Sequence, residues 1–264
     1  IITGGLGLDG FKEVSILDLI GKNEVSLDES LINEYLHGKR VLITGAGGTI
    51  GSELVRECLK YDPALLVVID KHENSLMKIE REVLAQQTNV LLKPLLSNIR
   101  DFDVLSKIYN NYEPQIVFHA ASYKHVSMQE SFPWEAVETN INGTLNLVKL
   151  SSKHNVEKFI LISTDKAVKP INIMSATKRL AEVICQGANH NMYTRFMAVR
   201  FGNLIDSKSS FITVLQEQIK SGGPVTITDP EMERYFMSSS EAAKLILQSG
   251  AFGKGGEIFS LDMG

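Results

Sequence analysis

Short apolar runs alternate with amphipathic helical periodicity from Lys39 to about residue 201, and this alternation constrains the fold more than any other feature. The expected strands are 41–44, 65–69, 90–96, 115–119, 158–163 and 197–201. The expected helices between them are 49–60, 73–87, 101–110, 134–153 and 174–188. Such alternation is typical of right-handed βαβ units. We therefore predict an α/β fold, a doubly wound parallel sheet with helices on both faces.

A glycine-rich turn joins the first expected strand to the first expected helix. The residues are Gly45-Ala46-Gly47-Gly48-Thr49-Ile50-Gly51. Glycines at 45, 48 and 51 allow a tight turn, a close backbone approach to a pyrophosphate and close helix packing, while the helix N-terminus supplies amide donors. Asp70 ends the next expected strand, where a carboxylate accepts hydrogen bonds from ribose hydroxyls and repels a 2′-phosphate. We predict a site for NAD rather than NADP, a preference that Lys71 weakens.

Two further strand ends are expected to flank this cofactor. Asn98-Ile99 follows the third strand and Ala120-Ala121 follows the fourth. In parallel sheets, ligands bind outside the carboxyl ends of the strands. The predicted cofactor-binding residues are thus Gly45, Gly47, Gly48, Thr49, Ile50, Gly51, Asp70, Asn98, Ile99, Ala120 and Ala121. A capping or surface role is the alternative for Asp70.

The pattern divides the chain into three parts. Residues 1–37 alternate short apolar runs with turn residues, and we expect an arm that lies on the domain. Residues 38–201 are expected to form a Rossmann-like NAD-binding domain. From 202 to 264 the pattern loosens into a helix near 209–220, a short strand at 225–227 and a helix near 239–250, which we interpret as a small substrate-binding lobe. Because the chain starts without methionine and stops as a strand ends, we expect a fragment with a truncated lobe.

Composition bears on the partners. The net charge of -4 and a pI near 5.9 provide no basic footprint for nucleic acid. No apolar run reaches the roughly 18 residues that a membrane-spanning helix needs. The two cysteines, Cys58 and Cys185, lie in amphipathic helical segments, which favours reduced thiols in a reducing cytoplasm. We expect a small charged metabolite as the partner, and no metal site.

An acid and a base stand side by side at the end of the fifth expected strand. Asp165 and Lys166 follow the apolar run 159–162, and Lys178 lies in the next helix. A carboxyl group that gives a proton beside an amine that takes one is what elimination of water requires. Because the carboxyl end of a parallel strand faces the ligand crevice, we predict that this pair is catalytic. A solvated surface ion pair is the alternative.

Taken together, several segments resemble one family. They are residues 44–53, 119–126, 163–168, 174–178, 200–203 and 234–237. Over residues 12–264 the chain resembles the extended short-chain dehydrogenase/reductases, and within them the bacterial UDP-N-acetylglucosamine 4,6-dehydratases of capsule, O-antigen and protein-glycan synthesis. Met174 stands where the superfamily usually carries tyrosine, as in the long membrane-anchored branch, whose anchor would lie upstream of Ile1. The resemblance implies a cytoplasmic catalytic domain at the inner face of a membrane and a homo-oligomer.

The resemblance also implies a reaction. A UDP-N-acetylhexosamine would lose its C4 hydrogen as hydride to NAD, then water across C5 and C6, and hydride would return to C6. Lys166 would take the C5 proton while Asp165 protonates the departing hydroxyl. Thr164 would hold the C4 oxygen, and Lys178 would bind the nicotinamide ribose. Met174 has no exchangeable proton and would only shape the pocket.

Other positions carry roles implied by the resemblance alone. The expected substrate-binding residues are Lys124, His125, Asn203 and Arg234. Arg234 suits bidentate phosphate binding, and Asn140 would support the active-site lysine through hydrogen bonds. Surface, capping or core roles are the alternatives. The chain departs from the family at Asn98, where aspartate is usual, and at 206–209, which replaces a glycine-containing loop.

Two other functions stay open. An NAD-dependent C4 epimerase shares the fold, but epimerisation needs no proton transfer at C5 or C6, so Asp165 and Lys166 argue against it. A non-catalytic NAD-binding module, with Met174 marking lost chemistry, is the second. The retention of Asp165, Lys166 and Lys178 together speaks against that reading.

Overall fold

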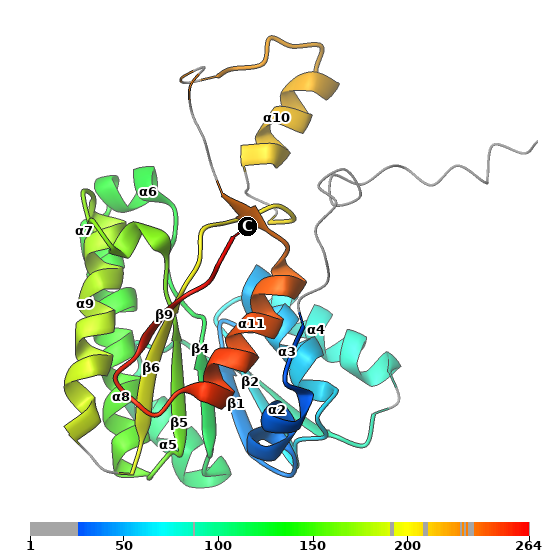
Figure 1. Cartoon of the computed structure of the whole chain (residues 1–264), viewed down its shortest axis with the longest axis vertical. Coiled ribbons are helices and arrows are strands. Elements are labelled where there is room, and N and C mark those ends of the chain that lie inside the picture. The colour runs from blue at the N-terminus through cyan, green and yellow to red at the C-terminus, as the bar shows by residue number, and fades with distance from the viewer. Residues whose placement is uncertain are drawn as a thin grey trace, which may run out of the picture.

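The computed structural model describes residues 26–86, 88–190, 193–207, 211–227, 229, 231 and 235–263. A seven-stranded parallel sheet forms its centre, with helices on both faces (Figure 1). The strands are β1 (Arg40–Thr44), β2 (Leu65–Asp70), β3 (Leu91–Leu96), β4 (Ile116–His119), β5 (Lys158–Ile162), β6 (Arg195–Arg200) and β9 (Ile258–Ser260). Their spatial order is β3-β2-β1-β4-β5-β6-β9. The order reverses between β1 and β4, the switch point at which doubly wound sheets bind ligands, so the α/β Rossmann-like prediction is confirmed.

The helices cover the two faces in separate layers. One layer holds α2 (Glu29–Leu36), α3 (Thr49–Leu59), α4 (Glu73–Ala85) and α11 (Ser239–Phe252). The other holds α5 (Phe102–Tyr112), α8 (Thr144–Lys153) and α9 (Ile173–Gly187). Val41 and Ile43 of β1 face the first layer and Leu42 faces the second, all without exposed surface. Because both faces are covered, the central strands read as continuous apolar runs.

The helix expected at 134–153 is interrupted. It consists of α7 (Pro133–Ala136), a π-helical segment η2 (Val137–Gly143) and α8. Gly143 lies directly against Ile99, since a Cβ built at Gly143 would come within 2.6 Å of the Ile99 Cδ1. The wider π turn carries the buried Asn140, whose Oδ1 accepts from the Tyr123 amide at 2.8 Å and whose Nδ2 donates to the Tyr123 carbonyl at 3.1 Å. Such single π turns often mark functional sites.

The C-terminal part differs from the expected lobe. The two-residue strands β7 (Asn203–Leu204) and β8 (Phe236–Met237) and the helix α10 (Phe211–Lys220) lie beyond the carboxyl edge of the sheet (Figure 1). By contrast, α11 packs against α2 and α3, and β9 pairs with β6 as the seventh strand. The apolar run Ala242, Ala243, Ile246 and Leu247 is fully buried there and holds α11 in the main layer. The strand expected at 225–227 is wrong, because these residues are not in a strand.

Near the N-terminus, α2 packs on α11 through the fully buried Ile32 and Leu36. The rest of the arm expected at 1–37, up to residue 25, lies outside the described residues. Cys58 and Cys185 are free and buried, which confirms the prediction of core thiols. Within the described ranges, no helix has the length and apolar character needed to span a bilayer.

Candidate active site

The glycine turn leaves an anion site open at the N-terminus of α3. Gly45 has a φ of +68°, and a Cβ there would stand 2.6 Å from the Ala121 amide nitrogen. A Cβ on Gly51 would stand 2.0 Å from the Gly45 carbonyl oxygen, so side chains are excluded at both points. No side chain caps the helix at Gly48. The first amides of α3, at Thr49 and the residues after it, are thus available to a pyrophosphate, and the turn fits a dinucleotide.

Asp70 joins this turn to the loop after β2. Its Oδ2 accepts from the Gly47 amide at 2.8 Å, and its Oδ1 accepts from the His72 amide at 2.8 Å. Each carboxylate oxygen keeps a second lone pair, so Asp70 can also accept from ribose hydroxyls. The neighbouring Lys71 ammonium donates to the Tyr123 hydroxyl and lies 4.0 Å from the centre of its ring. The cation next to Asp70 therefore points at an aromatic side chain of the loop after β4.

The other predicted cofactor residues lie along the same edge of the sheet. The Ala120 amide donates to the Thr44 carbonyl at 3.1 Å, which ties the end of β4 to the end of β1. Asn98 closes a turn by accepting from the Arg100 amide at 3.1 Å, and Ile99 is buried. The ends of β1, β2, β3 and β4 thus form one continuous edge, where the sequence predicts the dinucleotide.

The predicted acid and base form one hydrogen-bonded group after β5, in the short 3-10 turn η3 (Asp165–Ala167). The Lys166 Nζ lies 3.0 Å from the Asp165 Oδ1, and the Thr164 hydroxyl donates to the same oxygen at 2.8 Å. The side chain of Asp165 is 48% exposed and that of Lys166 is 36% exposed. The pair is therefore accessible to a ligand. Gly202 lies close to it, because a Cβ built on Gly202 would be 3.5 Å from the Asp165 Oδ2.

Lys178 and Met174 lie inward of this pair on α9. The Lys178 Nζ donates to the Ile162 carbonyl at 2.5 Å, and the residue is 6% exposed. Burial lowers the pKa of Lys178 to about 8, against the opposite effects of Glu182 and Cys185. One ammonium proton is used, so two remain for a ligand. Met174 is buried in the first turn of a helix that begins with a capping box formed by Asn172 and Ser175.

His119 forms a buried link that the sequence did not predict. Its Nδ1 lies 2.8 Å from the Thr44 hydroxyl, and its Nε2 lies 2.9 Å from the Thr144 hydroxyl, which donates to the Asn140 carbonyl at 2.7 Å. This order assigns the ring proton to Nε2, with Nδ1 accepting from Thr44. Burial, and after it the charge of Lys178, lowers the pKa of His119 to about 3. A neutral ring therefore joins β1, β4 and the π-helical segment.

Glu182 is the second residue that the prediction missed. It has no exposed surface, and its Oε1 accepts from the Ser163 hydroxyl at 2.5 Å. Arg200, at the end of β6, donates to both carboxylate oxygens, at 2.8 and 2.6 Å. The available signal was its position four residues after Lys178, on the same helical face.

The predicted substrate-binding residues do not form one hydrogen-bonded group among the described residues. The Lys124 Nζ donates to the Ser207 hydroxyl at 2.9 Å, whereas His125 is exposed at the N-cap of α6 (Val126–Ser131), where its side chain makes no capping bond. Asn203 donates from its Nδ2 to the Tyr235 carbonyl at 3.4 Å. Arg234 lies outside the described residues.

Asn140 differs in detail from its expected role. Its Nδ2 donates to the Thr177 hydroxyl at 3.0 Å, and thus to the residue before Lys178 rather than to the lysine itself. Lys178 donates its described hydrogen bond to the Ile162 carbonyl instead. Asn140 therefore supports the loop at Tyr123 and the Thr177 side chain of α9, because its amide reaches both.

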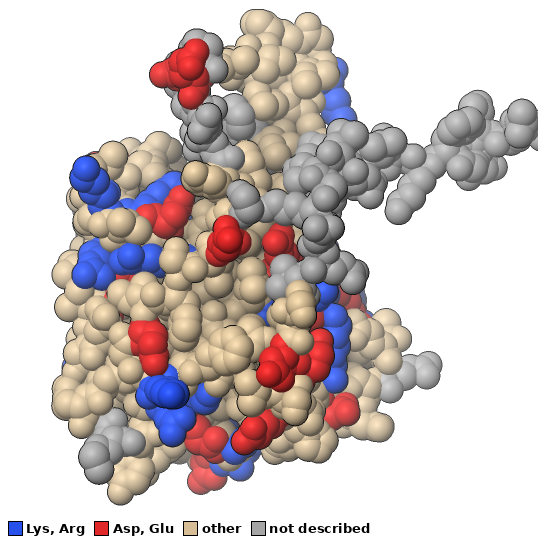
Figure 2. Space-filling model, viewed as in Figure 1, with Lys and Arg blue, Asp and Glu red and all other residues tan. Residues whose placement is uncertain are grey.

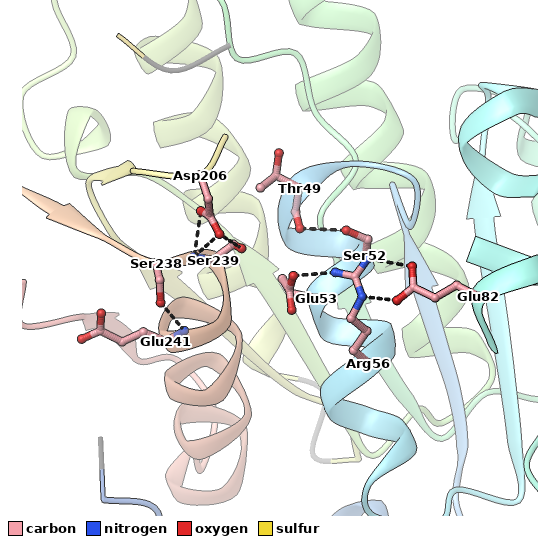
Figure 3. A network of polar contacts seen from close by, with 9 residues as sticks. All are labelled: Thr49, Ser52, Glu53, Arg56, Glu82, Asp206, Ser238, Ser239 and Glu241. Atoms are coloured by element: carbon pink, nitrogen blue, oxygen red, sulfur yellow. Dashed lines mark hydrogen bonds and ion pairs between the residues drawn. The ribbon is translucent and has the colours of Figure 1, made fainter. Parts of the chain in front are cut away.

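Asp206, the first residue of the segment 206–209, is bonded to α11. The Asp206 Oδ1 accepts from the Ser239 amide at 3.0 Å, and its Oδ2 accepts from the Ser239 hydroxyl at 2.5 Å, while the Ser238 hydroxyl caps the helix at Glu241 (Figure 3). Figure 3 also shows Arg56 of α3 paired with acidic residues of α3 and α4. Asp206 thus has a structural role here. Residues 208 and 209 lie outside the described part.

Charges on the visible face carry no single sign. In Figure 2, lysine and arginine side chains are interspersed with aspartate and glutamate over this face. Within the described residues, no three of His, Cys, Asp or Glu come together in a metal-binding cluster.

The comparisons with known proteins identify the family of the chain. The polysaccharide biosynthesis protein family matches residues 41–264. The chain belongs to this family. That membership confirms the resemblance drawn from the motifs, while the meaning of Met174 stays a prediction.

Individual relatives place the family among nucleotide-sugar enzymes. The capsular polysaccharide biosynthesis protein CapD of Staphylococcus aureus is 44% identical over 266 residues, which cover 100% of this chain and 44% of CapD. The inverting UDP-N-acetylglucosamine 4,6-dehydratase of Campylobacter jejuni is 32% identical, over 84% of this chain and 66% of that enzyme. UDP-glucose 4-epimerases of Rickettsia species are 31 to 32% identical. This chain spans less than half the length of CapD.

A solved structure matches the fold closely. The crystal structure of Pen from Bacillus thuringiensis superimposes with a TM-score of 0.80 at 34% identity, covering 87% of this chain and 70% of Pen. The sheet and its carboxyl edge are therefore shared with a protein of known structure.

Proposed function

We propose that the chain carries the catalytic site of an NAD-dependent nucleotide-sugar 4,6-dehydratase, which converts a UDP-N-acetylhexosamine such as UDP-N-acetylglucosamine to its 4-keto-6-deoxy form for a surface polysaccharide or glycan. The observation that carries the proposal is the hydrogen-bonded Asp165–Lys166 pair at the carboxyl end of β5. The relative named as a UDP-N-acetylglucosamine 4,6-dehydratase supports it. Because the chain spans only part of the length of its relatives, the activity is proposed for the whole protein, of which this chain is at least a part.

The cofactor proposal follows from the open edge between β1 and β4. The α3 N-terminus would hold the pyrophosphate, and Asp70 would accept from the adenosine ribose. Bound there, NAD supplies a hydride acceptor that returns the hydride later in the same turnover. The remaining ammonium protons of Lys178 would donate to the nicotinamide ribose, and Met174 would line the pocket beside it.

The acid–base pair suits elimination because its two states have the same net charge. One proton moved along the 3.0 Å hydrogen bond converts a carboxylate and an ammonium into a carboxylic acid and an amine. Lys166 then takes the C5 proton, and Asp165 gives its proton to the C6 hydroxyl, which leaves as water. The pair ends this elimination step in its starting ionic state. The proton that the C4 hydroxyl loses on oxidation would go to solvent, and a solvent-exchanged proton would return to C5 when the hydride returns to C6.

The initial transfer is uphill in water. Free aspartate carboxyl and lysine amine groups differ by about 6.5 pKa units, which corresponds to about 9 kcal/mol. A hexose that covers the exposed pair would exclude water and lower this cost, since an ion pair loses more stabilisation on desolvation than its neutral form does. Thr164 would release Asp165 and hold the C4 oxygen of the sugar.

A C4 epimerase is the second candidate, because sugar epimerases are among the relatives. Epimerisation needs hydride transfer at C4 alone and leaves Asp165 and Lys166 without a task. A non-catalytic NAD module would likewise leave Asp165 and Lys166 without a task. The upstream membrane anchor, the cytoplasmic placement and the homo-oligomer stay proposals that accompany the family resemblance.

One incubation separates the three functions. The purified chain is mixed with UDP-N-acetylglucosamine and NAD, and the nucleotide sugar is analysed by mass spectrometry and by NMR of the hexose. A dehydratase yields a product lighter by one water with a C6 methyl group. An unchanged mass with a new C4 configuration identifies an epimerase, and an unchanged sugar with bound NAD identifies a binding module. Either of the last two results would overturn the proposal.

A further inference from the structure

Glu182 is a buried charge to which the proposed mechanism assigns no task. Besides Ser163 and Arg200, it accepts from the Arg179 Nη1 at 3.0 Å, so both oxygens are occupied by donors. Burial raises the pKa of Glu182, but the hydrogen bonds from Arg200, Ser163 and Arg179 outweigh this, and its pKa lies below the usual value. The residue is therefore a carboxylate inside the protein. A buried charge costs stability unless it is paired, so its presence calls for a reason.

From successive turns of α9, Lys178 and Glu182 hold Ile162, the last residue of β5, and Ser163, which follows it. The Lys178 ammonium donates to the Ile162 carbonyl, and the Glu182 carboxylate accepts from the Ser163 hydroxyl. Thr164, Asp165 and Lys166 follow at once. The two side chains of α9 thus fix the backbone directly before the acid–base pair.

Glu182 also connects the end of β5 to the end of β6. Its bonds to Arg200 lie beside the backbone bonds from the Ser163 amide to the Val199 carbonyl at 2.7 Å and from the Asp165 amide to the Phe201 carbonyl at 3.1 Å. The segment that leads to Asn203 starts at the end of β6. One carboxylate therefore joins the two strand ends that carry the predicted catalytic and substrate residues.

The charge of Glu182 acts on Lys178. Burial lowers the pKa of Lys178, and the Glu182 carboxylate, followed by Cys185, is what opposes that effect. On β4, His119 is kept neutral. The charged or titratable groups on the other elements packed against α9 are Glu130 on α6, Glu135 on α7, Glu138 on η2, Lys149 and Lys153 on α8, Asp165 and Lys166 on η3, His190 on the turn after α9, and Arg195 and Arg200 on β6.

We propose that Glu182 is a positioning residue, whose buried carboxylate keeps Lys178 in its ammonium form for donation to the ribose of a bound dinucleotide and holds the ends of β5 and β6 together. The inference rests on the proposed NAD site and is independent of whether the reaction is dehydration. Glu182 itself touches neither cofactor nor substrate.

The test is the pH dependence of NAD affinity, measured by titration calorimetry with NAD alone between about pH 6 and pH 9.5. The wild-type affinity should fall as the pH rises through the pKa of Lys178 of about 8. In Glu182→Gln the pH midpoint of this loss of affinity should be lower by at least about one pH unit, which makes binding of NAD at pH 8 about fivefold weaker than in wild type. Glu182→Asp keeps the charge and should keep the wild-type midpoint.

Arg179→Gln is the matched control, because it removes one hydrogen bond to Glu182 and leaves the carboxylate in place. Its midpoint should equal that of wild type. If thermal unfolding shows that Glu182→Gln does not fold, the double variant Glu182→Gln/Arg200→Gln removes both charges of the buried pair and should show the same downward shift.

An unmoved midpoint in the Glu182→Gln or double variant, or an equal shift in Arg179→Gln, would overturn the inference. Wild-type protein that fails to bind NAD at any pH would instead overturn the proposed cofactor site, and the inference with it. The two failures are therefore distinct, since the first leaves NAD binding by the wild-type protein intact.

Discussion

The residue that matters most to the proposed chemistry is Asp165, because two donors meet at one of its oxygens. Thr164 and Lys166 both donate to the Asp165 Oδ1, and the pair is half exposed. An exposed ion pair contributes at most about 1 kcal/mol to stability. The pair is thus not needed for folding, and its substitution should affect chemistry alone.

Asp165→Asn and Lys166→Ala should each lower the rate of product formation by at least about a hundredfold, within the usual range of general acid–base help. Affinity for NAD and for the nucleotide sugar, measured by calorimetry, should change little, because Lys178 and the glycine turn remain. Unchanged turnover in both variants would rule out the assigned roles.

Met174 and Lys178 should differ sharply in their sensitivity to substitution. Met174→Leu nearly conserves volume at a buried position without an exchangeable proton, so we expect a loss of about tenfold or less in kcat/KM. Lys178→Ala removes a buried charge beside the predicted nicotinamide site and should cost at least about a hundredfold. Equal losses in the two variants would mean that the methionine takes part in a way that pocket shape does not explain.

At the scale of elements, the π-helical segment and the buried histidine set the shape of the carboxyl edge. Both were absent from the sequence prediction, for physical reasons. A π turn gives the same apolar spacing as a helix over a few residues, so the periodicity of 134–153 predicted one helix. The partners of His119 come from β1 and α8, which are distant in sequence.

Gly143→Ala should destabilise the protein by about 1–3 kcal/mol, the usual cost of overpacking. The reason is the 2.6 Å approach of a new Cβ to Ile99. Gly187→Ala, at the end of α9 where nothing lies within 4 Å of the new Cβ, is the matched control and should be neutral or slightly stabilising. Chemical denaturation measures both, and Ile99→Val should relieve part of the Gly143→Ala loss. Equal stabilities of the two alanine variants would contradict the described packing.

His119 should make stability sensitive to acid. Burial, and after it the charge of Lys178, lowers its pKa from the usual value near 6.5 to about 3, so between these values the unfolded chain binds more protons than the folded one. Stability should therefore fall as the pH drops below 6.5, by up to about 1.4 kcal/mol per pH unit from this residue, and the contribution should level off below about pH 3. In His119→Gln, urea unfolding should lack this component. A constant difference between variant and wild type from pH 7 to about pH 4 would show that His119 does not titrate in this way.

For the whole molecule, the alternation of strands and helices predicted the sheet, and the glycine turn with Asp70 predicted the edge where a dinucleotide would bind. The strand ends were placed within two residues because apolar runs buried on both faces have clear limits. The pairing of β9 with β6, the position of α11 and the Glu182 link depend on contacts between segments far apart in the chain. Local periodicity carries no information on such contacts, so the expected boundary at residue 202 placed α11 and β9 apart from the layers in which they pack.

The predicted site residues also differ in how far the structure brings them together. Thr164, Asp165 and Lys166 form one group, and Lys178 reaches the carbonyl just before it. Lys124 and Asn203 each contact the segments between β6 and α11 instead, and their roles in binding a sugar stay predictions.

The most direct test of the central claim is the reaction carried out in deuterium oxide with UDP-N-acetylglucosamine and NAD. If Lys166 removes the C5 proton and a solvent-exchanged group returns one, the product should be lighter by one water and should carry one deuterium at C5, as seen by mass spectrometry and by NMR. Asp165→Asn run in parallel should give neither change. A dehydrated product without deuterium at C5, or an intact sugar with an inverted C4, would contradict the account.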